Sequence, residues 1–369
     1  MTQVITWQNG TAMDDLVRLA VQTLGEGGLV ALPTETTYAL AANALAPNAV
    51  ERLKRHQNSG CLTLALADAS LVLEWLPDLG KAGQRLTRRL WPGPLTLLSG
   101  EGLPDGKVAN LPDPIRGDIK HEGRLGLRVP DHDAVLQVLR SSSWPVALSC
   151  DYDDANSTLI SAEEMVQAVG DDLSLVLDDG PSFFKQASTV VEVKGETWTI
   201  VREGVLSSKL VEDQAACRIV FVCTGNTCRS PLAEALCKKR LADRLGCSEA
   251  ELPNRGFVVL SAGLAAMIGE EAATEAVQAA RLYGANLEKH ASRQATVDLL
   301  LQADHVLAMT RGHLDLMAGL SALPGCKPRL LSASGEDIAD PIGGDRQVYE
   351  QCSRQIWYCL NPILDELLA

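Results

Sequence analysis

The second half of the chain alternates short apolar runs with longer amphipathic segments. The β-type runs occupy residues 218–223, 256–261, 304–309 and 327–332. Between them the spacing of apolar positions predicts helices. In residues 270–284 the acids Glu270 and Glu271 come first, Arg281 comes late and Gly284 supplies a stop, an order that the helix dipole favours. Strands separated by helices predict a small, doubly wound, four-stranded parallel α/β sheet.

The first half has short β-type runs with fewer helical stretches between them. Residues 29–44, LVALPTETTYALAANA, predict a strand, a threonine-rich turn and then a helix. Residues 90–98, LWPGPLTLL, carry two prolines around a glycine. Further apolar runs follow at residues 125–139, 188–193 and 200–204. Each pattern is weak when taken singly, because Pro-Gly pairs mark turns and threonine clusters cap or line strands.

A polar segment near residues 206–217, LSSKLVEDQAAC, separates the two halves and has no strong apolar period. A chain of 369 residues is also long for a single domain. We therefore expect a first domain over residues 1–208, a linker over residues 209–216 and a second domain over residues 217–369.

The overall composition narrows the classes of function. A net charge of −14 argues against a broad nucleic-acid-binding surface and is typical of a solvated acidic one. No run of about 18 apolar residues occurs, so no membrane span is expected. The opening residues, MTQVITWQNG, show no export signal. Ten cysteines without a disulfide-like framework suit a reducing compartment, and we expect a cytoplasmic protein.

The most informative stretch is FVCTGNTCRSPLAEAL, residues 221–236. A strand ends at Cys223, Arg229 follows, and a Ser-Pro pair opens a helix. A loop around a helix N-terminus supplies convergent N–H donors for phosphate, Gly225 permits dihedrals that other residues resist, and Arg229 can hold two phosphate oxygens. The same donors are expected to lower the pKa of Cys223. A thiolate facing a bound phosphorus atom is an activated nucleophile, so this order predicts covalent phosphoryl transfer.

The leaving group of such a reaction needs a proton donor. The stretch ADPIGG places Asp340 before Pro341, in a loop after the last predicted strand. An Asp-Pro pair is also compatible with an ordinary turn. Beside the cysteine loop, the interpretation of Asp340 as the general acid is favoured.

Residues 217–369 resemble the low-molecular-weight protein tyrosine phosphatases over nearly the full length of that family. The resemblance implies Cys223 as the nucleophile, Arg229 as the phosphate clamp and Asp340 as the general acid, with no metal. It implies that Cys228 can form a protective disulfide with the nucleophile, the alternative being a small residue that fills the loop. The residues of the phosphate loop and its support would be Thr224, Gly225, Asn226, Thr227, Cys228, Ser230 and Ser261.

The stretches CTGNTCRSP, ADHVLAMT and DPIGG are closer to the protein-arginine phosphatase branch of the family. That branch carries threonine at the position of Thr227, where tyrosine-specific members usually have an apolar residue. Ile342 departs from the branch, which tends to have an aromatic residue there. Phosphotyrosine and phosphoarginine in proteins are therefore both open as substrates, with phosphoarginine slightly favoured.

Arsenate reductases share this fold and loop and add two cysteines that relay oxidation. Cys352 and Cys359 form a candidate pair, but they follow the Asp-Pro loop, whereas the relay pair of that family comes much earlier. Residues 264–303 contain no cysteine. We expect Cys352 and Cys359 to be core or helix-face residues instead.

Residues 10–207 resemble the YrdC-type threonylcarbamoyl-AMP synthases. That family builds a twisted, mixed and mostly β sheet with flanking helices around a concave cleft. It combines threonine, bicarbonate and ATP with Mg²⁺ into an adenylate, which a tRNA threonylcarbamoyltransferase uses in tRNA modification. By position, the resemblance assigns the nucleotide and threonine cleft to Thr34, Lys54, Arg128, Ser149, Ser188, Thr189 and Arg202.

The same region departs from its family at several positions. The family's Lys-Gly-Arg-Pro stretch appears as residues 54–57, KRHQ, and a later proline is Cys61. Its Ser-Ala-Asn becomes Ser149-Cys150-Asp151, and an aspartate would repel anions. Two alternatives stay open: a bifunctional enzyme, or a phosphatase with a non-catalytic nucleotide-binding or RNA-binding regulatory domain.

Overall fold

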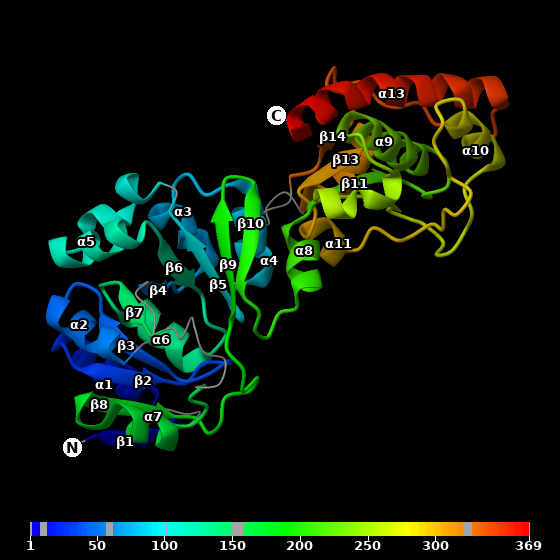
Figure 1. The fold of residues 1–369 in the computed structure, drawn as a ribbon. Coiled ribbons are helices and arrows are strands. Elements are labelled where there is room, and N and C mark those ends of the chain that lie inside the picture. The colour runs from blue at the N-terminus through cyan, green and yellow to red at the C-terminus, as the bar shows by residue number, and fades with distance from the viewer. Residues whose placement is uncertain are drawn as a thin grey trace. The chain divides into compact units, whose positions relative to one another are not determined.

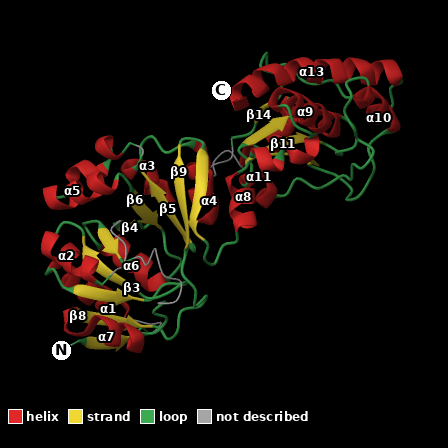
Figure 2. Cartoon of the chain, viewed as in Figure 1, coloured by secondary structure: helices red, strands yellow, loops and turns green. Residues whose placement is uncertain are grey.

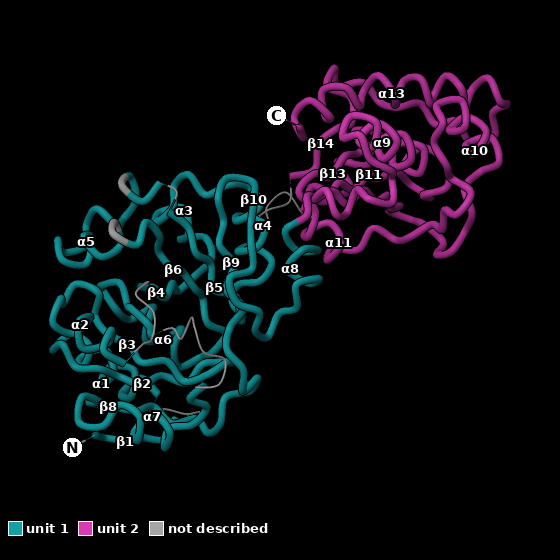
Figure 3. Tube along the Cα trace, in the orientation of Figure 1, with its two compact units in different colours: residues 1–215 teal, residues 216–369 magenta. Residues whose placement is uncertain are grey.

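The computed structural model describes residues 2–7, 13–56, 62–100, 102–149, 158–319 and 327–368. The chain divides into two compact units, Met1–Ala215 and Ala216–Ala369, coloured separately in Figure 3. Both units mix helices with strands, as Figure 2 shows. No helix in the described ranges has the length and apolar character needed to cross a membrane.

The first unit is built on one mixed sheet (Figure 1), with the strand order β1-β8-β2-β3-β7-β4-β6-β5-β9-β10. The sheet contains parallel pairs, such as β2 with β8, and antiparallel pairs, such as β2 with β3. The strands are β1 (Gln3–Thr6), β2 (Leu29–Leu32), β3 (Ala39–Asn43), β4 (Thr63–Ala65), β5 (Leu95–Ser99), β6 (Leu125–Arg128), β7 (Val146–Leu148), β8 (Leu173–Asp178), β9 (Thr189–Lys194) and β10 (Thr197–Arg202).

Helices cover both faces of this sheet because successive strand residues point to opposite sides. Val30 and Leu32 pack with helices α1 and α6, whereas Leu29 and Ala31 belong to a core that includes the other helices. The helices are α1 (Met13–Gly25), α2 (Pro47–Arg55), α3 (Val72–Trp75), α4 (Lys81–Leu90), α5 (Asp113–Glu122), α6 (Asp133–Ser141), α7 (Ala162–Val169) and α8 (Ser208–Ala215). The expected twisted mixed sheet with flanking helices is confirmed.

One element of this unit differs from its sequence-based prediction. The alanine-rich stretch after the threonine-rich turn was expected to be a helix, but it forms β3, and the next helix begins only at Pro47. Every residue of β3 is buried, and β3 pairs with both β2 and β7 in the middle of the sheet. Burial on both faces outweighs the helix propensity of alanine.

The segment expected to be a linker is also structured. Residues 208–215 form α8, which packs against α4 and belongs to the first unit. Val211 and Ala215 are buried in the core of that unit, while the rest of the helix is polar except for the exposed Leu210. Two apolar positions four residues apart are enough to hold a short helix on a larger core.

The second unit has a four-stranded parallel sheet in the order β12-β11-β13-β14. The strands are β11 (Cys217–Cys223), β12 (Phe257–Gly263), β13 (His305–Ala308) and β14 (Arg329–Leu330). The helices are α9 (Arg229–Leu245), α10 (Thr274–Arg281), α11 (Val297–Leu301), α12 (Arg311–Leu316) and α13 (Arg346–Leu368). The expected doubly wound fold is confirmed, with a strand near each of the predicted apolar runs.

The central strand β11 shows why this sheet needs helices on both faces. Ile219 and Phe221 lie in the core formed with α9, α10 and α13, and Val220 and Val222 lie in the core formed with α11 and the end of α12. Figure 1 shows α9 and α13 on one side of the strands and α11 on the other. A buried central strand is therefore apolar at consecutive positions, as the run RIVFVC is.

Helix α10 begins later than predicted, at Thr274, so Glu270 and Glu271 precede it. The backbone before the helix is held elsewhere: the Glu270 carbonyl accepts from the Ser292 N–H, and the Ala273 N–H donates to the Thr227 carbonyl. Gly284 has a positive φ of 72° after the helix, as its predicted role as a stop requires.

Candidate active site

The loop between Cys223 and Arg229 joins the carboxyl end of the central strand β11 to the N-terminus of α9. In doubly wound sheets this is the usual place of a ligand site. Two backbone N–H groups that follow β12 donate to the loop: Leu264 N–H to the Cys223 carbonyl and Ala265 N–H to the Thr224 carbonyl, each at 2.9 Å. The neighbouring chain therefore fixes the first half of the loop.

The Cys223 side chain is 3% exposed and lies under the loop. Its Sγ atom is 2.9 Å from Ser230 Oγ and 3.3 Å from the N–H nitrogen of Asn226. Both groups can donate a hydrogen bond to the sulfur, and α9 begins directly after the loop. Hydrogen-bond donors and a helix N-terminus of this kind stabilise an anionic sulfur nucleophile.

Asn226 is the residue that bends the loop. Its φ is 58°, in the left-handed region, where asparagine is tolerated better than most residues. Its Nδ2 donates to Ser230 Oγ and to Ser261 Oγ, both at 2.9 Å, and its Oδ1 accepts from the Arg293 N–H at 2.8 Å. The conformational freedom predicted for Gly225 is not used, because Gly225 has no positive φ. The left-handed turn occurs one residue later.

Behind Asn226, the predicted Ser261 contacts further polar residues that the sequence did not indicate. Ser261 Oγ donates to Glu234 Oε2 at 2.6 Å, and Glu234 is paired with Lys238 at 2.5 Å. His290 Nε2 is 2.7 Å from the Asn226 carbonyl oxygen. Both the side chain and the backbone of Asn226 are thus held from β12, α9 and the segment after α10.

Arg229 and Asp340 meet beside the loop. An Arg229 guanidinium nitrogen lies 2.5 Å from Asp340 Oδ2, and a second one lies 3.4 Å from the Ile338 carbonyl oxygen. The Arg229 side chain is 7% exposed and that of Asp340 is 44% exposed. The structure therefore brings the predicted clamp and the predicted acid into direct contact, with the carboxylate on the solvent side.

The mouth of the loop carries Thr224, which is exposed, and Thr227, which is half-buried. Thr227 Oγ1 is 3.7 Å from Cys228 Sγ. Ile342 follows the Asp340 turn, where its N–H donates to Asp340 Oδ1 at 3.2 Å, and its side chain is 72% exposed. Thr224 and Thr227 thus place two hydroxyl side chains on the loop, and Ile342 places an aliphatic side chain beside Asp340.

The described cysteines are all free thiols, including Cys223 and Cys228. Cys228 Sγ lies 3.2 Å from the Tyr349 hydroxyl, and burial together with this contact raises the pKa of Tyr349. Burial raises the pKa of Cys352 to about 12 and also raises that of Cys359. Cys352 is a core residue and Cys359 packs against the same core. Both thiols stay protonated near neutral pH, which suits packing better than redox relay.

In the first unit, Thr34 and Arg128 lie in one buried cluster. Thr34 Oγ1 is 3.0 Å from Thr36 Oγ1 and 2.5 Å from the Thr37 carbonyl oxygen. Arg128 donates to Glu35 Oε1 and to Thr36 Oγ1, both at 2.7 Å. The Glu35 carboxylate is 7% exposed and was not indicated by the sequence. The Thr34 hydroxyl organises its own turn, and Arg128 is already paired with a carboxylate.

Ser188, Thr189 and Arg202 form a second group at the start of β9. Thr189 Oγ1 donates to the Leu206 carbonyl and accepts from two backbone N–H groups, so it organises the chain after β10. Arg202 donates to the Ser188 carbonyl at 3.0 Å, and Ser188 Oγ is 2.8 Å from Thr96 Oγ1. Ser149 Oγ accepts from the Leu40 N–H at 3.0 Å.

Lys54, Arg55 and His56, at the end of helix α2, each have a carboxylate partner. Lys54 Nζ is 2.7 Å from Asp118, Arg55 is 2.9 Å from Glu51, and His56 Nε2 is 2.9 Å from Asp172. The ion pair of Lys54 with Asp118 therefore does not connect Lys54 to the Arg128 cluster. The family departures at residues 57, 61, 150 and 151 lie outside the described residues.

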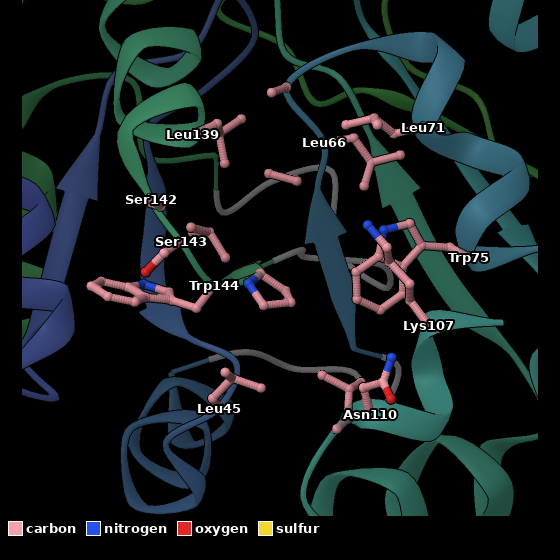
Figure 4. Close-up of a pocket in the computed structure, with 15 residues that line it drawn as sticks. Leu45, Leu66, Leu71, Trp75, Lys107, Asn110, Leu139, Ser142, Ser143 and Trp144 are labelled. Atoms are coloured by element: carbon pink, nitrogen blue, oxygen red, sulfur yellow. The ribbon is translucent and has the colours of Figure 1, made fainter.

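The described residues of the first unit enclose cavities, two of which bear on the predicted site. One of about 370 Å³, shown in Figure 4, is lined mainly by apolar side chains, with Lys107 and Asn110 on one wall and Ser142 and Ser143 on the other. None of the predicted binding residues lines it. The other, of about 300 Å³, includes Thr34 among its walls. In the described part of the chain, no group of three or more His, Cys, Asp or Glu side chains is arranged to hold a metal ion.

Residues 218–368 match the family model of the low-molecular-weight phosphotyrosine protein phosphatases. The protein-arginine-phosphatase of Geobacillus stearothermophilus is 35% identical over 156 residues, which cover 41% of this chain and 95% of that protein. The chain belongs to the low-molecular-weight phosphotyrosine protein phosphatase family. We call the unit Ala216–Ala369 the phosphatase domain. A crystal structure of a YwlE mutant from Bacillus subtilis, 34% identical, covers 42% of this chain and 100% of its own, with a TM-score of 0.37.

Residues 22–204 match the Sua5/YciO/YrdC model, described as telomere recombination. The threonylcarbamoyl-AMP synthase of Pyrococcus abyssi is 29% identical over 199 residues, which cover 53% of this chain. This chain spans 56% of the length of that synthase. The expected YrdC-type domain is confirmed, and we call the unit Met1–Ala215 the Sua5-like domain.

The supporting residues of the phosphatase domain leave only faint sequence signals. Glu234 sits five residues after Arg229, between two buried alanines, and His290 is one of six histidines in the chain. Neither has a spacing that indicates its partner, because Ser261 and Asn226 are brought to them by the fold. A buried carboxylate among apolar helix positions is the better signal of the two, since it requires a partner.

The close approach of the loop to Gly263, at the end of β12, predicts that this position does not accept a larger residue. A Cβ atom on Gly263 would lie against the Thr224 carbonyl oxygen and 2.9 Å from the Asn226 nitrogen. Gly263→Ala is therefore expected to lower the free energy of unfolding by about 1–3 kcal/mol, as overpacking does. Urea unfolding would measure this, with hydrogen exchange of β11 and β12 peptides locating the loss.

Gly225→Ala is the matched control, because the nearest atom to its added Cβ, Thr227 Oγ1, is 3.7 Å away. Its free energy of unfolding should change by no more than about 0.5 kcal/mol. Equal losses in the two variants would contradict the assignment of Gly263 as the tight contact.

Proposed function

We propose that the phosphatase domain hydrolyses phosphorylated side chains of proteins through a phosphocysteine intermediate. The observation that carries this is the convergence of Cys223, Arg229 and Asp340 on one loop at the end of β11. A thiol with two donors, a guanidinium and a carboxyl group are the nucleophile, clamp and acid that the reaction needs. The similarity to the Geobacillus stearothermophilus protein-arginine-phosphatase, and to the low-molecular-weight protein-tyrosine-phosphatase PtpB of Staphylococcus haemolyticus, supports the same class of substrate.

In the first step, phosphoryl oxygens bind the backbone N–H groups of the loop and the Arg229 guanidinium. They take the place of the Asp340 carboxylate, which is the exposed member of the present ion pair. Cys223 Sγ then attacks phosphorus while the bond from phosphorus to the leaving atom breaks. Asp340, protonated from solvent once it has left Arg229, gives that proton to the leaving oxygen or nitrogen, so tyrosine departs as a neutral phenol and arginine as its guanidinium ion.

In the second step, water attacks the phosphocysteine and the sulfur–phosphorus bond breaks. Asp340 takes the proton from the water, and inorganic phosphate leaves. The electron pair returns to Cys223 Sγ, where Ser230 Oγ at 2.9 Å and the Asn226 N–H can stabilise the thiolate. No metal takes part in either step.

We infer that phosphoarginine is the preferred substrate. The support is the polar mouth, where Thr227 is half-buried beside the loop and Thr224 is exposed. A phosphorylated guanidinium carries N–H groups that hydroxyl oxygens can accept, whereas the ring of phosphotyrosine offers none at its edge.

The role of Asp340 predicts a dependence on the leaving group. Asp340→Asn should slow hydrolysis of substrates with poor leaving groups by about 10²–10⁴-fold, and activated aryl phosphates much less. Rates for a series of leaving groups would measure this, with inhibition by inorganic phosphate as the control for an intact clamp. Equal losses across the series would show that Asp340 is only a turn residue. Cys223→Ser should have no turnover with any member.

The substrate preference predicts the effect of Thr227→Ile. Loss of the hydroxyl contact should lower kcat/KM for phosphoarginine relative to phosphotyrosine by about ten- to hundredfold, the equivalent of about 1–3 kcal/mol. Thr227→Ser keeps the hydroxyl and should keep most of the preference. An unchanged ratio in Thr227→Ile would leave Thr227 as a packing residue and remove the main support for phosphoarginine.

We further propose that the Sua5-like domain binds ATP and threonine and forms the threonylcarbamoyl adenylate for hand-off to a tRNA-modifying enzyme. The specific observation is Arg128, whose guanidinium is 5% exposed and whose Nε has no hydrogen-bond partner among the described residues. A buried donor without a partner favours a ligand that supplies an acceptor. Mg²⁺ would enter with the nucleotide, whose phosphates it neutralises.

Calorimetric titration of the full chain with ATP·Mg and threonine tests this second activity, with pyrophosphate release followed in the presence of bicarbonate. Binding with release is expected. Binding without release would assign the domain a regulatory role instead. Arg128→Gln should weaken binding by about tenfold or more, as loss of a charged hydrogen bond does. No binding to the wild-type chain would contradict both roles.

A further inference from the structure

His313 links the mouth of the phosphate loop to the neighbouring strand. It lies on α12, which begins three residues after β13, and β13 runs parallel to β11 beside it. His313 is 6% exposed, whereas Thr224, the residue after the nucleophile, is exposed at the mouth. The topology thus places a buried imidazole next to an exposed hydroxyl of the loop.

Both nitrogens of the imidazole have threonine partners. His313 Nε2 is 2.9 Å from Thr224 Oγ1, and Nδ1 is 2.9 Å from Thr310 Oγ1. Thr310 Oγ1 also accepts the backbone N–H of His313 at 3.3 Å, as the N-cap of α12. The ring is therefore held at both ends, and Thr224 is held by the ring.

The surroundings of His313 favour the neutral imidazole. Burial and the nearby Arg229 guanidinium lower the pKa of His313, and the carboxylates of Asp337 and Asp340 act in the opposite direction with smaller effect. A neutral ring has one N–H and one lone pair. If Nε2 carries the hydrogen, Thr224 Oγ1 accepts it and keeps a second lone pair; if Nδ1 carries it, Thr224 donates to Nε2 and keeps both lone pairs. In either tautomer Thr224 can accept one more hydrogen bond.

We propose that His313 is a positioning residue that holds the Thr224 hydroxyl as a second acceptor, beside Thr227, for the N–H groups of a phosphorylated guanidinium. This rests on the phosphoarginine preference proposed above and extends it to the other side of the loop. The held hydroxyl favours a leaving group that carries N–H donors over an aryl one. The segment before Asp340 is also hydrogen-bonded to the end of β13, because the Ile338 N–H donates to the Met309 carbonyl at 2.8 Å.

The test compares kcat/KM for a phosphoarginine and a phosphotyrosine peptide in a set of variants. Thr224→Val should lower the phosphoarginine-to-phosphotyrosine ratio about tenfold, the usual effect of one lost hydrogen bond. Thr224→Ser, the matched control, keeps the hydroxyl and should keep the ratio. His313→Leu should lower the ratio by a similar factor, and the double variant His313→Leu, Thr224→Val by no more than either alone, since His313 acts through Thr224.

His313→Gln keeps a side-chain amide that can reach Thr224, and it should restore most of the ratio that His313→Leu loses. A role in folding alone would lower both activities together and leave the ratio unchanged, so that outcome overturns the proposal. Additive losses in the double variant, or no effect of Thr224→Val in an enzyme whose ratio does respond to Thr227→Ile, would also overturn it. If the wild-type chain does not hydrolyse phosphoarginine at all, the substrate preference itself fails, and this inference fails with it.

Discussion

The hydrogen bonds of Asn226 are the constraint on which the phosphatase site depends. A left-handed residue in a tight loop costs conformational free energy. Here the side chain of Asn226 holds it, because Nδ2 donates to Ser230 and Ser261 and Oδ1 accepts from the Arg293 N–H. The turn that Asn226 makes brings its own N–H to Cys223 Sγ and lets α9 begin at Arg229. The nucleophile and the clamp therefore take their positions from a residue that need not touch the substrate.

The sheet makes this loop possible. Strand β11 is central, so its carboxyl end receives support from β12 on one side and β13 on the other. From β12 come Ser261 and the close approach of Gly263, and after β13 come Thr310 and His313. A loop on an edge strand would have one of these neighbours and not both. The chemistry is thus built from segments that meet only because the strands are parallel and adjacent.

The sequence predicted those parts of the site that are local in the chain. The strand, loop and helix from Cys223 to Ser230 could be predicted because phosphate binding needs that order of residue types, and the four parallel strands because their apolar runs are separated by helical ones. The left-handed turn was expected at Gly225, because glycine is the usual residue there, but hydrogen bonds from distant residues stabilise it at Asn226. The helix expected after residue 38 failed for the same kind of reason, since burial between β2 and β7 decided the conformation.

The two domains differ in the carboxylate partners that their buried arginines have before any ligand binds. Arg229 has one carboxylate partner, and Asp340 is 44% exposed, so water can solvate it once a phosphoryl group displaces it. Arg128 is paired with Glu35, whose side chain is 7% exposed and also accepts from the Asp131 N–H. An anion that displaced Glu35 from Arg128 would leave the Glu35 carboxylate buried without its counter-ion. Because an unpaired buried charge costs far more than a solvated one, an anion binds more readily at the cysteine loop than at Arg128. A ligand of the Sua5-like domain therefore fits the Arg128–Glu35 pair best if it offers a donor to the Glu35 carboxylate and an acceptor to Arg128 Nε. An amino acid carries both groups, an ammonium donor and a carboxylate acceptor.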